Sequence, residues 1–98
     1  HIAAVVGEKM VSIADNHQVL CVTHLPQIAA LADVHFMVQK QDDGQTTRTS
    51  LKRLEMEERY EYIARMMSGM EDSKLAYEHA RELITHSEEI KQKRRKNK

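Results

Sequence analysis

A short apolar run at residues 18–23 separates two segments of helical periodicity, and it limits the folds open to this chain. Its centre, Val-Leu-Cys-Val, is apolar and β-branched, as is typical of a strand buried on both faces of a parallel sheet. Apolar residues recur at helical spacing before it, over Ile2–Asn16. They recur again after it, over Leu25–Ala32, with Pro26 in the first turn. The pattern predicts an α/β fold in which a strand passes into a helix through a very short turn.

The next segment alternates with the period of a strand. Val34–Lys40 and Thr46–Leu54 flank Asp43-Gly44, a strong turn signal, so they predict a hairpin. Helical spacing returns after Leu54 on a face made of Met56, Tyr60, Ile63, Ala64 and Met67. Gly69 is expected to end that helix.

A last helix is expected to begin at a cap supplied by Asp72 or Ser73. Its expected inner face comprises Leu75, Ala76, His79, Ala80, Leu83 and Ile84. The predicted order is helix, strand, helix, hairpin, helix, helix. One strand and a hairpin would leave a sheet edge uncovered, so we expect the partner strands to lie upstream in a larger protein. The start of the chain at His1, already in helical periodicity, agrees with that expectation.

Two regions are expected: residues 1–87 as one folded unit, and residues 88–98 as a basic helical tail. Net charge is zero, but the six cations of the tail follow the last acidic residue, Glu89. They are Lys91, Lys93, Arg94, Arg95, Lys96 and Lys98. A solvated helix end that suits the helix dipole is one interpretation, and contact with nucleic acid is the other. Because no aromatic residue is interleaved to stack on bases, the first is favoured.

The composition predicts a cytoplasmic protein. Cys21 is the single cysteine, so an internal disulfide is excluded. No apolar run approaches the roughly 20 residues that cross a bilayer, and no signal peptide is visible.

His24 is the candidate functional residue. With Thr23 it would follow the buried strand and precede a helix N-terminus, the crevice in which open α/β sheets bind ligands. Such a position favours an anion, and an imidazole can donate a further hydrogen bond to a phosphate oxygen. The alternative is a histidine that ends a strand and bonds only backbone.

Other chemistries are disfavoured. Side-chain alternation along a strand would place Cys21 and His24 on opposite faces, which argues against a nucleophile pair. The six histidines are scattered without a close pair, so we predict no metal site. His79 is expected in the core or at an interface, and His17 and His35 are expected to be exposed. No G-x-x-x-x-G-K-[ST] loop and no strand ending in Asp-Glu is present, so the chain alone should not hold ATP and Mg²⁺.

Residues 21–33, Cys-Val-Thr-His-Leu-Pro-Gln-Ile-Ala-Ala-Leu-Ala-Asp, closely resemble the switch-histidine segment of the RecN family of bacterial DNA-repair proteins, which are ABC-type ATPases of the SMC class. The resemblance covers nearly the whole chain. Further matches are Ala3-Ala4, Gly7–Met10, Thr46–Arg48, Glu57–Arg59, Ile63–Met66, Gly69 and His79–Leu83.

The resemblance implies the C-terminal part of a P-loop ABC/SMC-type ATPase head. In that family the counterpart of His24 contacts the γ-phosphate of ATP when two heads close as a homodimer, and Thr23 and Gln27 match the same motif. It further implies double-strand-break repair and recombination at the nucleoid, with DNA as a partner. ATP, Mg²⁺ and the remaining site residues would come with the full-length protein, so this piece would be inactive alone. The alternative is a non-enzymatic helical module that binds DNA or a partner through its basic tail.

Overall fold

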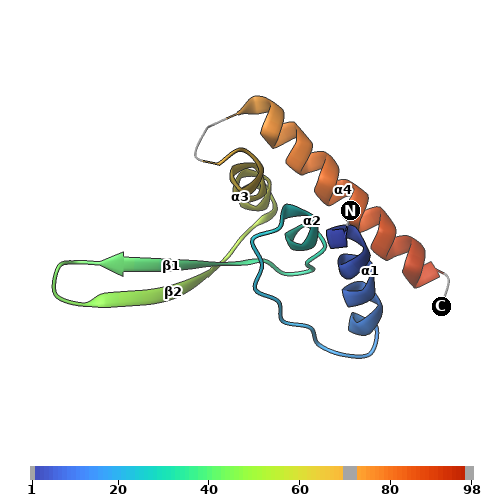
Figure 1. Cartoon of the computed structure of the whole chain (residues 1–98), viewed down its shortest axis with the longest axis horizontal. Helices are drawn as coiled ribbons and strands as arrows, with labels where there is room; N and C mark the ends of the chain where they lie inside the picture. Colours follow the sequence, from blue (N-terminus) through green and yellow to red (C-terminus); the bar gives the residue numbers. More distant parts are fainter. Residues whose placement is uncertain (1, 70–72, 97–98) are drawn as a thin grey trace.

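The structure, a computed structural model, describes residues 2–69 and 73–96. Their elements follow the order α1, α2, β1, β2, α3, α4 (Figure 1). Three longer helices surround the short α2, and the two strands form a hairpin that projects away from them. The fold is mixed helix and strand, as the sequence predicts at this coarse level.

Helix α1, Ile2–Ala14, confirms the first predicted helix but ends two residues before Asn16. Much of its apolar surface is exposed, including Ile2, Val5, Val6 and Ile13. Its buried residue is Gly7, where a Cβ atom would lie 2.5 Å from Leu31 Cδ1. The missing side chain therefore lets α1 approach the segment that follows α2.

The predicted strand at residues 18–23 is absent from the structure. These residues form an irregular connection between α1 and α2, in which Leu20 is 90% exposed and Val22 is 96% exposed. A strand needs a neighbour to bond its backbone, and in the described part of the chain the two hairpin strands pair only with each other. The prediction of a buried strand is therefore wrong for this structure, in which the described residues leave the apolar run exposed.

Helix α2, Pro26–Ala29, occupies the middle of the predicted helix over 25–32 and is one turn long. Pro26 lies at its start, as predicted. The hairpin is also confirmed: β1, Phe36–Asp42, pairs antiparallel with β2, Thr47–Arg53. Asp43 Oδ1 accepts backbone bonds from Gln45 and Thr46, and Gly44 has a φ of +89°, which favours glycine.

Helix α3, Met56–Ser68, confirms the helix predicted after Leu54, and Gly69 ends it with a φ of +76°. Its buried residues are Arg59, Ile63 and Ala64. Met56 and Met67, predicted on the same face, are exposed instead. The face that packs inward is thus rotated toward Arg59.

Helix α4, Lys74–Lys96, is longer than its apolar pattern predicts. Ser73 caps it, since the Ala76 N–H donates to Ser73 Oγ at 3.1 Å, whereas the other candidate cap, Asp72, lies outside the described residues. The buried side of α4 contains Ala76, Ala80, Ile84, Ser87 and Lys91. The predictions that Leu75 and His79 face inward are wrong, because both are exposed.

The core lies where α3 and α4 pack together over α2. Its buried residues are Ala29, Ala30, Ile63, Ala64, Ala76, Ala80 and Ile84. The Cα radius of gyration is 15.0 Å. A compact chain of this length would have a radius of about 13 Å, so the molecule is extended by its hairpin and by α4.

Candidate phosphate-contact site

Thr23, His24 and Leu25 form a tight turn just before α2. The backbone N–H of Leu25 donates to Thr23 Oγ1 at 3.0 Å, which closes the backbone around His24. The imidazole is exposed. A ring in this position is free to donate to an anion in solvent or on another part of the protein.

Helix α2 begins directly after this turn. The carbonyl of Leu25 accepts from the N–H groups of Ile28 at 3.1 Å and Ala29 at 3.0 Å. Gln27 lies in the first turn and is exposed. The three residues singled out from the sequence, Thr23, His24 and Gln27, are therefore neighbours on one turn, where Thr23 has a backbone role and His24 and Gln27 face solvent.

Arg59 of α3 binds the other end of α2. Its Nη2 donates to the carbonyls of Ala29 at 3.4 Å and Ala30 at 3.3 Å, and the side chain is buried. Burial lowers the pKa of Arg59, while the Glu88 carboxylate, among other groups, acts in the opposite direction. In the sequence, Arg59 belongs to the matched segment Glu57–Arg59, but no role was predicted for it. The available signal was a charged residue four positions before Ile63, on the apolar stripe of a helix.

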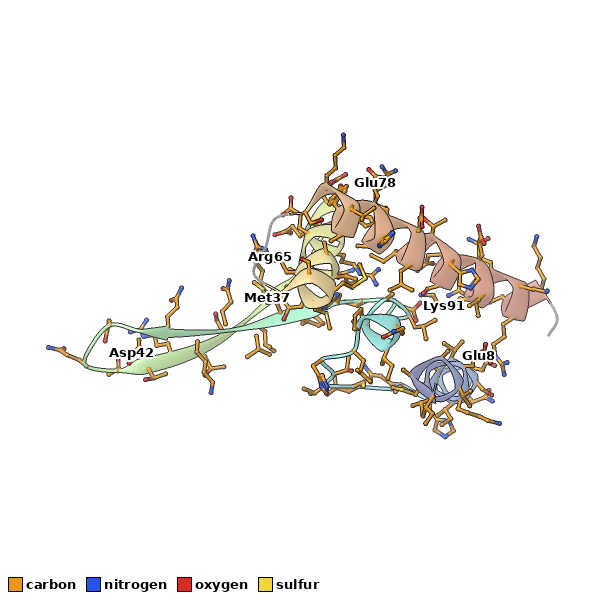
Figure 2. The ribbon with its side chains drawn as sticks, turned by 45° about the horizontal axis from the view of Figure 1, so that its top comes forward. Glu8, Met37, Asp42, Arg65, Glu78 and Lys91 are labelled. Atoms are coloured by element: carbon orange, nitrogen blue, oxygen red, sulfur yellow. The ribbon has the colours of Figure 1, made fainter. Side chains whose placement is uncertain are left out.

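Lys91 of α4 holds the segment that follows α2 (Figure 2). Its Nζ lies 2.9 Å from Asp33 Oδ1 and 2.9 Å from Glu88 Oε1, and donates to the Ala32 carbonyl at 3.4 Å. The Lys91 side chain is only 5% exposed. Asp33, which belongs to the matched motif, is thus an ion-pair partner.

Arg94 connects the same helix to α1. Its Nε donates to Asp15 Oδ2 at 2.8 Å, and its Nη2 donates to Ser12 Oγ at 2.8 Å. The prediction of a solvated end to the last helix is therefore wrong for Lys91, which is buried, whereas Arg94 is exposed although it is paired. The pattern predicted cations at a helix C-terminus, but it could not show that acidic groups just after α1 and in the α2–β1 connection would reach them.

Replacement of Lys91 by methionine should destabilise the chain by about 1–2 kcal/mol, since the Ala32 carbonyl loses its donor while Asp33 and Glu88 can still be hydrated. Methionine keeps the packing of the aliphatic stem. Urea unfolding followed by far-UV circular dichroism would measure the change. Lys93→Met, at an exposed position of the same helix, is the matched control. Equal unfolding midpoints for the two variants would contradict this account of Lys91.

His35 lies beside this region and is half-buried, contrary to the predicted exposure, whereas His17 is exposed as predicted. Its ring meets Tyr62 edge to face, with centroids 5.3 Å apart. Burial, and secondarily the charge of Arg59, lowers the pKa of His35, which favours the neutral imidazole. A neutral ring suits a position next to a buried guanidinium.

The described residues offer neither a metal centre nor a membrane-spanning helix. Within residues 2–69 and 73–96, no group of three His, Cys, Asp or Glu side chains could hold a metal ion. Over the same residues, no helix is long and apolar enough to cross a membrane. The exposed Cys21 is a free thiol in the irregular segment before His24.

Fold and site together define a mixed helix–strand segment. In it, the turn that carries His24 is connected through the one-turn helix α2 to the packed helices α3 and α4. No protein-family model matches this chain. It is 42% identical over 90 residues to the DNA repair protein RecN of Halalkalibacterium halodurans, which is 92% of this chain and 16% of that relative. It is 46% identical over 82 residues to RecN of Streptomyces coelicolor, covering 84% of this chain and 14% of that protein. For Bacillus subtilis RecN the identity is 41% over 91 residues, with 92% and 16% covered.

These matches confirm the resemblance to the RecN family over nearly the whole chain. The chain spans less than a fifth of the length of these relatives.

Proposed function

We propose that this chain is the switch-histidine segment of a RecN-type ATPase head that acts in the repair and recombination of DNA double-strand breaks. His24 would donate a hydrogen bond to the γ-phosphate of ATP when two heads close around the nucleotide as a homodimer. The observation that carries the proposal is the Thr-His-Leu-Pro-Gln-Ile-Ala-Ala string, in which His24 is exposed on a turn anchored by α2. Such a donor would stabilise negative charge that develops on phosphate oxygens.

The chain supplies one part of such a site. Its sequence contains no phosphate-cradling G-x-x-x-x-G-K-[ST] loop and no apolar strand ending in Asp-Glu, so other segments would bind the triphosphate and Mg²⁺. Mg²⁺ would neutralise phosphate charge there. Within this chain, Thr23 would shape the turn, and Gln27 would present its side-chain amide from the first turn of α2.

The exposed apolar residues before the turn support a larger head. Val19, Leu20 and Val22 are exposed in this chain, although their pattern is that of a strand buried on both faces. We propose that residues 18–23 pair with strands supplied by the remainder of the head upstream, and that the exposed face of α1 covers the same sheet. Burial there would set His24 at the sheet edge.

Turnover measurements on the intact protein and on the 98-residue chain test the proposal. The intact protein should hydrolyse ATP, and the chain alone should show neither hydrolysis nor ATP-dependent protection of its amide hydrogens from exchange. The reason is that a single imidazole contact cannot offset the loss of freedom on binding a triphosphate. ATP hydrolysis by the isolated chain would contradict the proposed division of the site.

The alternative, a DNA-binding module that uses the basic tail, receives less support. Lys91 and Arg94 are already paired with acidic groups of the same chain, and Arg95 lies 3.6 Å from Asp33 Oδ1. Cations held in this way attract phosphate less, because each carries a neutralising partner. We therefore assign the basic end of α4 a structural role. We also propose that the protein acts in the cytoplasm, at the nucleoid.

A further inference from the structure

Three hydrogen bonds connect α3 to both neighbours of His24. Arg59 Nη2 donates to the Ala29 carbonyl at 3.4 Å, and the Ala29 N–H donates to the Leu25 carbonyl at 3.0 Å. The Leu25 N–H then donates to Thr23 Oγ1 at 3.0 Å. His24 lies between Thr23 and Leu25. Because α2 has only four residues, its two ends move together, and a displacement at Arg59 reaches the histidine turn.

The carbonyls of Ile28 and Ala29, at the C-terminal end of α2, accept the N–H groups of Leu31 at 3.1 Å and Ala32 at 3.2 Å. A carbonyl oxygen can accept a second hydrogen bond, and a cation is favourable at this end of a helix. Arg59 provides both, and it also donates to the Ala30 carbonyl at 3.3 Å. Ala29 and Ala30 are themselves in the core, so α2 is fixed by packing as well as by these bonds.

Stability alone does not account for an arginine here. Arg59 is 5% exposed, and among the described residues its buried Nε has no hydrogen-bond partner. The desolvation of a buried charge costs free energy, and this cost offsets much of what the two carbonyl bonds contribute. What an apolar side chain could not do is hold the carbonyls that set the orientation of α2.

We propose that Arg59 is a positioning residue for His24: from α3 it fixes α2 and thereby the direction in which the histidine turn presents its imidazole. The inference rests on the proposed function, in which His24 meets the γ-phosphate. Arg59 itself is buried behind α2 and contacts no substrate.

The test is a double-mutant comparison in the intact ATPase. Arg59→Met keeps most of the side-chain length and removes the donors, Arg59→Lys keeps one charged donor, and Arg65→Met changes an exposed residue of the same helix as a control (Figure 2). Arg59→Met should lower kcat about tenfold with KM for ATP nearly unchanged, because a small misplacement of a phosphate-contacting group weakens the transition state. Arg59→Lys should restore part of this loss, and Arg65→Met should have no effect.

The decisive measurement repeats Arg59→Met in a His24→Ala protein. If Arg59 acts through His24, the further loss of kcat should be less than about twofold. Equal losses in the two backgrounds would overturn the positioning role and leave the proposed function standing. Unchanged turnover in His24→Ala itself would overturn the proposed function and this inference together.

A second readout serves if Arg59→Met does not fold. In the folded Arg59→Lys protein, the amide hydrogens of Leu25 and Ala29 should exchange faster than in the parent, while those of the hairpin stay unchanged. Faster exchange confined to these amides supports the connection from α3 to the turn. Unaltered exchange at Leu25 and Ala29 would overturn it.

Discussion

His24→Ala in the intact protein should lower the rate of ATP turnover about a hundredfold, the usual effect of removing one donor that stabilises charge in the transition state. The imidazole is exposed, and His24 is not one of the core residues. Its loss should therefore leave the free energy of unfolding within about 0.5 kcal/mol of the parent value. Steady-state kinetics and far-UV circular dichroism on the same samples would measure both quantities.

His86→Ala is the matched control for this variant, since His86 is an exposed histidine on α4, remote in sequence from the turn. It should turn over ATP at the parent rate. If His24→Ala also retains full activity, the phosphate contact is rejected. If both variants lose activity together, the effect would reflect general damage and the assignment to His24 would likewise fail.

Ile84→Ala should destabilise the chain by about 2–5 kcal/mol, the range observed when a buried aliphatic side chain is truncated and a cavity remains. Ile84 is 1% exposed and belongs to the core shared by α3, α4 and α2. Because that core also contains Ala29 and Ala30, the loss should be accompanied by faster amide exchange in α2.

Urea unfolding of the chain would measure the loss at Ile84, and Leu75→Ala supplies the comparison. Leu75 lies on the same helix and is exposed, although its spacing predicted an inward position. Its truncation should change the free energy of unfolding by less than about 0.5 kcal/mol. Equal effects at Ile84 and Leu75 would mean that α4 presents a different face to the core from the one described.

The elements that the sequence predicted well are those that have a local sequence signal. Helices α1 and α3 follow apolar spacing, and the hairpin follows alternation around Asp43-Gly44, where a positive φ is needed. Gly69 and Ser73 end and begin helices through backbone conformation and a single side-chain bond. Each of these signals lies within the element itself or at its ends.

The strand predicted at residues 18–23 is absent for a different reason, which is not local to the segment. Its residues have the composition of a buried strand, but a strand exists only when another backbone bonds to it. Residues 18–23 connect α1 to the turn at His24 without pairing with a described strand. Their apolar pattern therefore indicates a buried environment that the described residues do not provide. That difference supports a sheet supplied by the rest of the protein, as proposed above.

The sequence by itself determined where the helices and the hairpin lie, and it singled out His24 through the residues around it, because periodicity and motif are properties of neighbouring residues. The tertiary structure alone decided that Arg59 and Lys91 are buried against α2 and the segment after it, and that Arg94 reaches α1. The sequence shows where a cationic residue lies in the chain, but not which groups its side chain binds. Whether it is solvated, or held by carbonyls and carboxylates as many as 79 positions away, depends on which helices pack together.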